Sequence, residues 1–331
     1  MTASGVDDDE AHIVADVLVW SNLVGRHPQG VIRIPAYLAR FRKSLILSPC
    51  SPTFQSKSAS IEILNGGHGF GQYIGHLGMS RAIEIAEKQG VGVVAVLRSN
   101  HFGTGAYYVD LATRKNKIGI ALSNSTPRVA PHAGTTAVLG TNPFSFGAPT
   151  KGAKPVLVDF STSMISGSAI RQAIEEKQHL PDGLVVDAAG QSVTNPQEAV
   201  HAAILPFGGA KGFGLGLVIE ILCGIVTGAA FSHQIASMYH DLDNHADVGH
   251  FFIAIEIENL LPLDTYFDRM EQLIAWVKDA NRVPGVLEIV IPGESRWREY
   301  EQQLKSGIRI SRRTMESLGD LAAGLSVPTP W

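Results

Sequence analysis

The stretch GVGVVAVLRSN, residues 90–100, decides the fold class because it is a nearly continuous apolar run that ends in polar residues. Such a run is typical of a strand that is buried on both faces. Residues with helical spacing precede it at 79–90 and follow it at 104–116, and a second apolar strand is expected at 118–125. This alternation predicts an α/β protein.

The same reasoning assigns the rest of the chain. Residues 44–60 are rich in serine and proline and are expected to form a boundary loop, and 140–149 are rich in turn residues. Residues 164–204 are expected to be mainly helical and looped. Helices are predicted at 7–24, 213–231 and 264–282, and strands at 61–64, 154–162, 251–257, 287–293 and 307–311.

Composition excludes several classes of protein. With 331 residues, 45% hydrophobic and 18% charged, the chain is too apolar to be disordered. The net charge is −4 and no basic stripe is present, which argues against nucleic-acid binding. The apolar stretch 213–231 is interrupted by Glu220 and by glycines, so we interpret it as a buried helix rather than a membrane span.

The N-terminus MTASGVDDDE lacks the features of a signal peptide. The two cysteines, Cys50 and Cys223, are best interpreted as reduced thiols, which predicts a cytoplasmic protein.

The 34 glycines raise the question of a dinucleotide-binding loop. The nearest match to G-x-G-x-x-G is Gly67-His68-Gly69-Phe70-Gly71, where the spacing is wrong for the tight turn and helix packing of a Rossmann site. The P-loop pattern is absent too, since Lys211 is followed by Gly212 instead of a hydroxyl residue. A nucleotide, if one binds, is therefore held in another way.

Two residues are candidates for chemistry at small molecules. His101 follows the buried strand, where a side chain commonly faces a ligand crevice, and its ordinary pKa suits proton transfer near neutrality. Arg33 lies among apolar residues in GVIRIP and is suited to bind a substrate carboxylate. A structural histidine and a structural salt bridge remain the alternatives.

Further polar residues are candidates for binding a nucleotide. Asp159 and Ser161 could bind ribose hydroxyls or simply cap the next helix. The glycines at 208–212 around Lys211 could present backbone N–H groups to a phosphate. The histidines at 233, 240, 245 and 250 match no zinc signature, so no metal site is predicted. No G-x-S-x-G elbow is present, and serine-hydrolase chemistry has no support.

Several motifs occur together in one order, and their combination is specific. They are SNHFG (99–103), ALSNSTP (121–127), LGTNPFSFGAPT (139–150), VDFSTS (158–163), PFGGAKGFGLGL (206–217) and IPGE (291–294). From about residue 7 to about 323 the chain resembles the malate/L-lactate dehydrogenase family. That family comprises NAD(P)-dependent oxidoreductases unrelated to the Rossmann-type enzymes, and it includes cyclic ketimine reductases.

The resemblance implies an atypical, non-Rossmann α/β domain that binds NAD or NADP, at residues 61–295, with 164–204 as a small insertion. It also implies a helical domain from both chain ends, residues 1–60 with 296–331, and a homodimer with sites at the subunit interface. His101 would transfer the proton, Arg33 would hold the substrate carboxylate, and Thr141 and Asn142 would shape the pocket. The cofactor would be contacted by Ser125, Asp159, Phe160, Ser161, Lys211, Gly293 and Glu294.

The chain departs from the family pattern just before Arg33. The family usually has Ser-His-Gly-Val there, and that histidine serves as proton donor in several members. Here Pro28 and Gln29 occupy the Ser-His positions, and glutamine cannot deliver a proton at neutral pH. His27 lies two residues earlier and is a candidate substitute.

These observations lead to one functional expectation and two alternatives. We expect reversible hydride transfer at C2 of a small 2-hydroxy or 2-oxo acid, with NAD or NADP as cofactor and no nucleic-acid or membrane partner. The alternatives are reduction of a cyclic imino acid and a catalytically weakened nicotinamide-binding paralogue.

Overall fold

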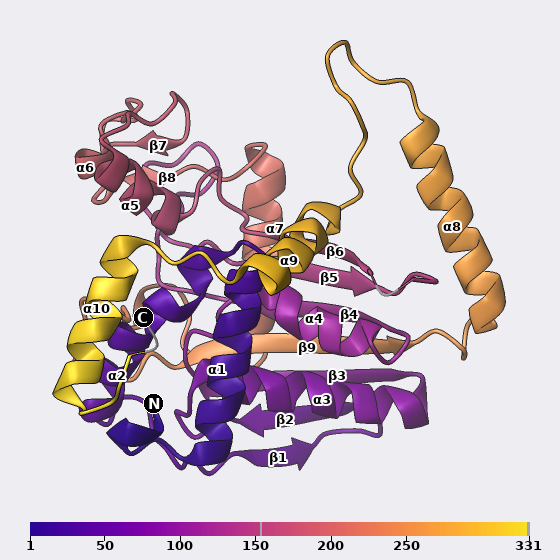
Figure 1. Ribbon diagram of the computed structural model, residues 1–331, viewed down its shortest axis with the longest axis horizontal. Helices are drawn as coiled ribbons and strands as arrows, with labels where there is room; N and C mark the ends of the chain where they lie inside the picture. The colour runs from indigo at the N-terminus through magenta and orange to yellow at the C-terminus, as the bar shows by residue number, and fades with distance from the viewer. Residues whose placement is uncertain (153, 330–331) are drawn as a thin grey trace.

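The computed structural model describes residues 1–152 and 154–329, and its centre is a mixed β-sheet with helices on both faces (Figure 1). Among the described residues the sheet has seven strands in the order β1-β2-β3-β9-β4-β5-β6. The strands are β1 (Thr53–Ser56), β2 (Ile61–Asn65), β3 (Val91–Ser99), β4 (Lys117–Ser123), β5 (Phe144–Ala148), β6 (Val156–Phe160) and β9 (Val248–Glu256). The expected α/β class is confirmed.

The direction of the strands differs from a parallel α/β sheet. β2 and β3 run parallel, whereas β3 pairs antiparallel with β9, and β9 pairs antiparallel with β4. β3 therefore has one parallel and one antiparallel neighbour, and His101 follows a strand of a mixed sheet instead of a parallel one. An apolar run reflects cover on both faces and leaves strand direction open.

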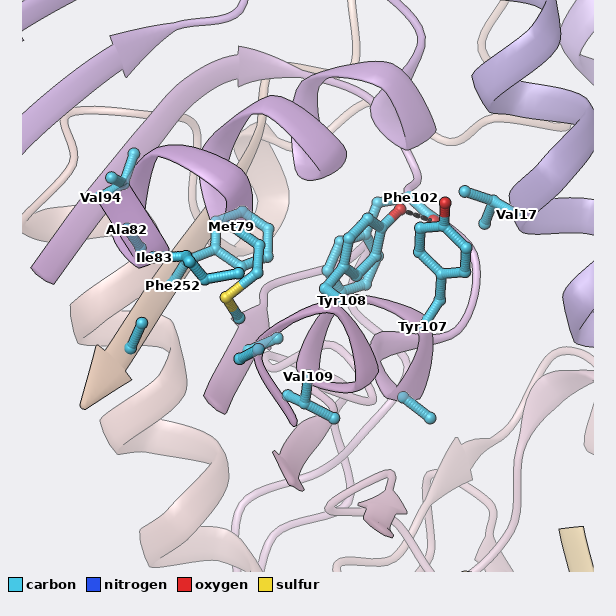
Figure 2. Close-up of a cluster of buried hydrophobic side chains, with 14 of the residues drawn as sticks. Val17, Met79, Ala82, Ile83, Val94, Phe102, Tyr107, Tyr108, Val109 and Phe252 are labelled. Atoms are coloured by element: carbon cyan, nitrogen blue, oxygen red, sulfur yellow. Dashed lines mark hydrogen bonds between the residues drawn. The ribbon is translucent and has the colours of Figure 1, made fainter. Parts of the chain in front are cut away.

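Two layers of helices cover the sheet. α3 (Gly71–Gln89) and α4 (Gly105–Thr113) pack on one face, and α7 (Ala210–Glu220) with its π-helical continuation Ile221–Ile225 packs on the other. Side chains alternate between the faces along β9: Phe252 lies in the α3/α4 core, and Phe251 packs with α7. Figure 2 shows the first of these cores, with Phe102, Tyr108 and Phe252 together.

The glycine-dense segment before β3 serves close packing. A Cβ on Gly71 would lie 2.2 Å from the carbonyl oxygen of Asn100, so α3 begins directly against the backbone beside His101. A Cβ on Gly75 would lie 2.7 Å from the Tyr108 ring. The helix starts at Gly71 instead of the predicted 79, because its glycines lie inside it and let it approach the sheet and α4.

The helices at the two chain ends pack together. α1 (Asp8–Leu23) lies against α9 (Glu294–Ser306), and α2 (Ile34–Arg42) lies against α10 (Arg312–Gly324). The Trp20 and Trp297 rings meet edge to face at 6.3 Å. The division of the chain into a helical and an α/β domain remains a proposal. Residues 330–331 of the proposed helical domain lie outside the described residues.

Residues 164–204, called the small lobe here, have a core of their own. They contain α5 (Gly167–Glu176), α6 (Pro196–Ala199) and the paired short strands β7 (Val185–Val186) and β8 (Ala203–Ile204). Ile170, Val185 and Ile204 are buried in this core. The lobe thus carries a small sheet that was not anticipated.

Other expectations need correction. Residues 287–293 and 307–311 are irregular, and in the described part of the chain neither segment is a strand of a sheet, although the Leu157 amide of β6 donates to the Pro292 carbonyl at 3.0 Å. The boundary loop 44–60 contains β1, and the turn-rich stretch 140–149 contains β5. Short 3₁₀ helices occur at Thr2–Ser4, His27–Gln29, Val31–Arg33 and Ser232–Gln234.

α8 (Leu263–Asp279) extends away from the rest of the chain and returns through a long loop to α9 (Figure 1). None of its described side chains is buried. Across residues 1–152 and 154–329, no helix is both long enough and apolar enough to cross a membrane.

Candidate active site

His101 is held in place by contacts of the preceding residue, Asn100, and of its own ring. The Asn100 amide donates to the carbonyls of His68 (3.1 Å) and Gly69 (2.9 Å), which ties the end of β3 to the loop before α3. His101 Nδ1 lies 2.7 Å from the Tyr37 hydroxyl on α2. The Gln72 side-chain amide on α3 donates to the same hydroxyl at 2.7 Å.

This chain of contacts fixes the orientation of the His101 ring. The Tyr37 oxygen has two lone pairs, so it can accept from the Gln72 amide and from Nδ1–H together, and its hydroxyl can also donate to Nδ1. Nε2 has no hydrogen bond to any described residue, which leaves it for a ligand. Burial raises the pKa of Tyr37 to about 12, so the phenol keeps its proton.

The environment keeps His101 uncharged. Burial, followed by the positive charges of Arg33 and, more weakly, Arg171, lowers the pKa of His101 to about 3. A neutral imidazole in a site with two arginines is suited to exchange a proton with an anionic ligand.

Arg33 closes the 3₁₀ turn before α2 and is buried. Its Nε donates to the Pro28 carbonyl at 2.6 Å, and its guanidinium lies 5.5 Å from the centre of the Tyr239 ring. Burial lowers the pKa of Arg33 to about 10. No described carboxylate forms an ion pair with it, which argues against the structural salt bridge and favours an anionic ligand.

The two candidates before Arg33 have different environments. His27 Nδ1 contacts the Asn22 amide at 2.9 Å and is thereby held toward α1. The side-chain oxygen of Gln29 is buried and has no partner in the described chain. The Gln29 backbone lies beside Gly103, in the loop that carries His101. Gln29 is therefore the better placed of the two to contact a ligand.

Four segments from the predicted cofactor site are linked by hydrogen bonds. The Thr141 amide donates to Ser125 Oγ (3.1 Å), the Thr162 amide donates to the Thr141 carbonyl (2.9 Å), and the Phe207 amide donates to the Thr162 carbonyl (3.0 Å). These hydrogen bonds hold residues that are far apart in the sequence next to one another.

Asp159 lies at the end of β6 and bonds within the protein. Its carboxylate accepts from Thr104 Oγ1 (2.8 Å), from Ser145 Oγ (2.9 Å) and from Arg296 (2.9 Å). Burial alone would raise the pKa of Asp159, but Arg296 and the two hydroxyls lower it below its usual value. Thr104 follows His101 by three residues, so Asp159 also stabilises the loop that carries the histidine.

The start of α7 fits a phosphate group. Gly208 and Gly209 have φ of 55° and 62°, a conformation that favours glycine, and they bring the chain into the first turn of the helix. A Cβ on Gly209 would lie 3.3 Å from the His132 ring, a tight contact that glycine avoids. Lys211 in the same turn is exposed and unpaired among the described residues. These features match what a dinucleotide phosphate needs.

The remaining predicted residues have varied surroundings. Phe160 is 39% exposed and meets Phe207 edge to face at 5.5 Å. Ser161 accepts from Ser163 at 3.0 Å. The Asn142 amide donates to Glu220 on α7 at 2.6 Å.

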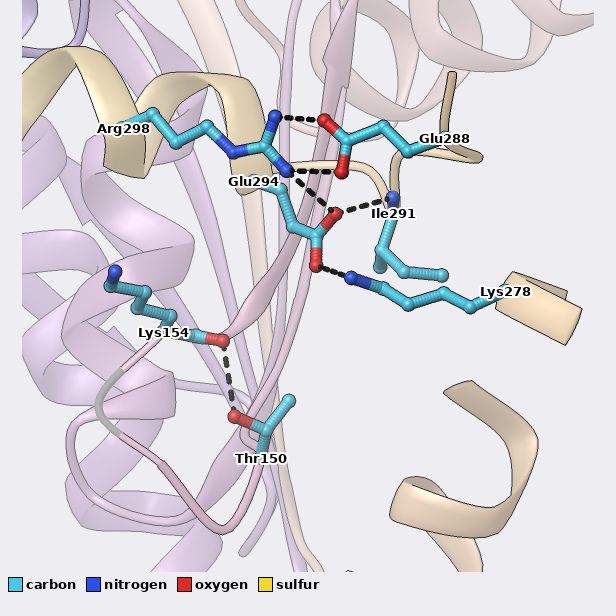
Figure 3. Close-up of polar contacts among 7 residues, drawn as sticks. All are labelled: Thr150, Lys154, Lys278, Glu288, Ile291, Glu294 and Arg298. Atoms are coloured by element: carbon cyan, nitrogen blue, oxygen red, sulfur yellow. Dashed lines mark hydrogen bonds and ion pairs between the residues drawn. The ribbon is translucent and has the colours of Figure 1, made fainter. Parts of the chain in front are cut away.

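Glu294 contacts the α8 arm (Figure 3). Its carboxylate pairs with Lys278 and accepts from the Ile291 amide at 3.0 Å. The preceding Gly293 has φ of 103° and packs against Leu157 of β6. Their role at the cofactor stays a prediction.

The histidines at 233–250 have separate surroundings. His245 stacks on His68 with ring centres 3.9 Å apart, and His250 contacts the hydroxyls of Ser99 and Ser123 at 2.9 Å each. In the described ranges no group of three or more histidine, cysteine or acidic side chains could hold a metal.

Sequence reasoning missed four residues of this site: Tyr37, Gln72, Arg171 and Tyr239. Tyr37 lies four residues after Arg33, so one helical turn places both on the same side, and this spacing could have identified it. The others reach the site through long-range packing and carry no local signal.

Comparisons with known proteins show the family of the chain. Residues 1–319 match the family model for malate/L-lactate dehydrogenase. The malate dehydrogenase of Pyrococcus abyssi is 34% identical and aligns over 99% of this chain and 91% of its own length. The crystal structure of malate dehydrogenase from Entamoeba histolytica superposes with a TM-score of 0.95 at 28% identity, covering 100% of this chain and 95% of that one.

Two relatives carry a cofactor in their names. Ureidoglycolate dehydrogenase (NAD(+)) of Escherichia coli is 30% identical over 93% of this chain and 87% of its own length. (2R)-3-sulfolactate dehydrogenase (NADP(+)) of Chromohalobacter salexigens is 29% identical over 86% of this chain and 85% of its own length. Because the family model matches nearly the whole length of the chain, the chain belongs to the malate/L-lactate dehydrogenase family.

Proposed function

We propose that this protein is an NAD(P)-dependent oxidoreductase that interconverts a small 2-hydroxy acid and the corresponding 2-oxo acid. The observation that carries the proposal is the pairing of a buried, neutral His101 with a buried Arg33 that has no acidic partner in the described chain. A carboxylate on Arg33 would place the adjacent C2 oxygen near the histidine.

The chain's own residues account for binding and proton transfer. Arg33 binds the carboxylate and orients C2. In oxidation, neutral His101 carries its proton on Nδ1, directed at the Tyr37 oxygen, accepts the substrate hydroxyl proton at Nε2 and becomes an imidazolium. In reduction, the imidazolium gives the Nε2 proton to the oxygen at C2 and returns to the neutral form, and Tyr37 keeps its own proton in both directions. When bound, the nicotinamide supplies the hydride chemistry.

The cofactor would lie along the hydrogen-bonded segments described above. In this proposal Ser125, Ser161 and Lys211 contact the cofactor, and Asp159, Phe160, Gly293 and Glu294 lie at the border of its site. The mixed sheet supports a binding mode other than the Rossmann mode, because a doubly wound site needs parallel strands at its crevice. The relatives include both NAD(+) and NADP(+) enzymes, so we propose NAD or NADP as cofactor.

The two alternatives are less well supported. The curated relatives compared above are dehydrogenases of hydroxy acids, which does not favour an imino acid as substrate. The intact contacts of His101 with Tyr37, and of Tyr37 with Gln72, argue against a weakened paralogue. A cytoplasmic location remains a prediction from the cysteine content.

A direct assay tests the proposal. Purified protein with NADH or NADPH should oxidise the cofactor when pyruvate, oxaloacetate or 3-sulfopyruvate is added, well ahead of piperideine-2-carboxylate. Thermal stabilisation by the cofactor without turnover of any of these acids would contradict it and favour the weakened paralogue.

The pH dependence of oxidation follows from the low pKa of His101. Its neutral form, which accepts the proton, is present above about pH 3 in the free protein, whereas an ordinary histidine would be protonated below about 6.5. We therefore expect kcat/KM for L-lactate or L-malate oxidation to show no acid limb between pH 6 and 7. A limb with an apparent pKa near 6.5 would contradict this environment.

Gln29→His tests whether the departure from the family pattern is a loss. Because His101 transfers the proton, Gln29 contributes at most a neutral hydrogen bond to the ligand. We therefore expect kcat for 2-oxo acid reduction to change by less than about threefold. An increase of tenfold or more would show that Gln29 stands in place of a needed proton donor. His27→Gln is the matched control and should leave kcat unchanged.

We also propose that the protein is a homodimer. On α8, Leu273 and Trp276 are 53% and 65% exposed, and the loop after it exposes Leu287 by 89%. α7 and its continuation expose a second apolar surface, including Val218 and Ile225. Apolar patches of this kind mark interfaces.

Light scattering should give a mass twice 35.4 kDa, and Trp276→Asp should shift it toward the monomer. A monomeric mass for the unchanged protein at micromolar concentration would contradict the homodimer.

A further inference from the structure

Two arginines from distant parts of the chain meet at one aromatic ring. Arg33 precedes α2, and Arg171 lies on α5 in the small lobe. Their guanidinium carbons lie 5.5 Å and 5.2 Å from the centre of the Tyr239 ring. The ring therefore holds two positive groups beside His101.

The Tyr239 segment is itself firmly anchored. Arg40 is buried on α2 and donates to the carbonyls of Asp241 (2.6 Å) and Asn244 (2.8 Å) on either side of a turn. The ring is thus attached to the same helix that carries Tyr37. Both guanidinium groups therefore lie beside a ring that is anchored to α2.

The two positive charges have no directly bonded acidic partner. In the described chain neither Arg33 nor Arg171 forms an ion pair or a hydrogen bond to a carboxylate. Glu175, one helical turn after Arg171, pairs with Arg313, and its charge acts on Arg171 only from a distance. Burial lowers the pKa of Arg33, and Arg171 adds to the effect, so the two cations repel each other. Such an arrangement is stabilised when anionic groups bind between them.

A single carboxylate balances only one of these charges. We propose that Arg171 binds a second anionic group on the substrate, so that the preferred 2-hydroxy acid carries a further carboxylate or sulfonate at its distal end. This rests on the proposed function, in which Arg33 takes the C1 carboxylate. Arg171 is exposed, so a ligand that enters from solvent can reach it.

A cofactor phosphate is the competing partner for Arg171. The charge of Arg171 acts on Arg33 and His101, which are at the proton-transfer end of the site. A 2′-phosphate belongs to the opposite, adenosine end of NADP. The surroundings of Arg171 therefore favour the substrate.

The test compares substrates with one and two acidic groups. In Arg171→Gln, we expect kcat/KM for oxaloacetate and 3-sulfopyruvate to fall about 10- to 100-fold, as for a lost charge-assisted hydrogen bond. The value for pyruvate should change less than about threefold, and KM for NADH and NADPH should not rise. Arg171→Lys should recover part of the loss. The larger loss in kcat/KM, for oxaloacetate or for 3-sulfopyruvate, shows whether Arg171 prefers a second carboxylate or a sulfonate.

Lys177→Gln removes a charge from the end of the same helix and serves as the matched control, with no expected change. Equal losses for pyruvate and oxaloacetate, or a raised KM for NADPH alone, would overturn the proposal.

A binding measurement separates this proposal from the proposed function. Calorimetry on the protein with NADH should show succinate binding more tightly than butyrate, with the difference lost in Arg171→Gln. If that holds but no 2-oxo acid is turned over, the proposed function fails and the anion site stands. If pyruvate and oxaloacetate are reduced alike by the unchanged protein and by Arg171→Gln, the function stands and the anion site fails.

Discussion

Replacing His101 with asparagine is expected to lower kcat for 2-oxo acid reduction by about 10²- to 10⁴-fold, the range for a lost general acid or base. Asparagine is similar in size and polar, but it cannot exchange a proton. The cofactor should still bind, because His101 contacts Tyr37 and none of the linked segments at Ser125, Thr141 and Thr162. Stopped-flow absorbance of NADH at saturating substrate measures the effect.

Two variants complete the His101 test. His12→Asn, at an exposed position on α1, is the control and should retain full activity. Tyr37→Phe keeps the ring but removes the hydroxyl that contacts Nδ1, so it should have a smaller loss than His101→Asn. A loss below tenfold in His101→Asn would contradict its role as proton carrier.

Replacing Arg33 with glutamine is expected to lower kcat/KM by about 100- to 1,000-fold, as expected when one partner of a buried charge pair is removed. The loss should be similar for pyruvate and oxaloacetate, because both present the C1 carboxylate to this residue. Arg33→Lys should recover little, since a lysine cannot form the two parallel hydrogen bonds of a guanidinium. Steady-state kinetics with both acids measures these values.

The Arg33 variant also needs a control for folding. Arg33 is buried and donates to the Pro28 carbonyl, so thermal unfolding of the variant should be compared with the unchanged protein. A folded variant with kcat/KM within fivefold of the original would contradict the assignment of Arg33 to the carboxylate.

The parts of the fold that depend on local pattern could be predicted from the sequence. The expected helix at 7–24 is found at Asp8–Leu23, capped by Asp7, whose carboxylate accepts from the Asp9 amide at 3.1 Å. The apolar run at 90–100 forms β3. Both signals come from periodicity and capping within a few residues.

The errors occur where the environment lies outside the local sequence. Residues 287–293 contain the apolar run Ile289–Ile291, which is typical of a strand, yet Leu287 is 89% exposed and the segment returns from the α8 arm. An apolar pattern indicates that side chains favour burial, but it does not show whether the backbone pairs with a neighbouring strand. β5 was missed for a related reason, because glycine and proline in 140–149 masked a strand that tertiary pairing with β4 and β6 stabilises.

The candidate site shows the same division. His101 and Arg33 were identifiable because a strand end and an isolated charge are local features. Gln72 and Tyr239 act through contacts that span 35 residues or more in the sequence, and Arg171 belongs to a lobe whose position follows from packing.

The central claim is that hydride and proton are exchanged at C2 of a 2-oxo acid. The most direct measurement is mass spectrometry of the product formed from oxaloacetate with NADH deuterated at C4 of the nicotinamide. The account predicts a 2-hydroxy acid that carries one deuterium at C2 when the transferred face is labelled, and none when the opposite face is labelled. A product without deuterium from either face, or no product with any of the tested acids, would contradict it.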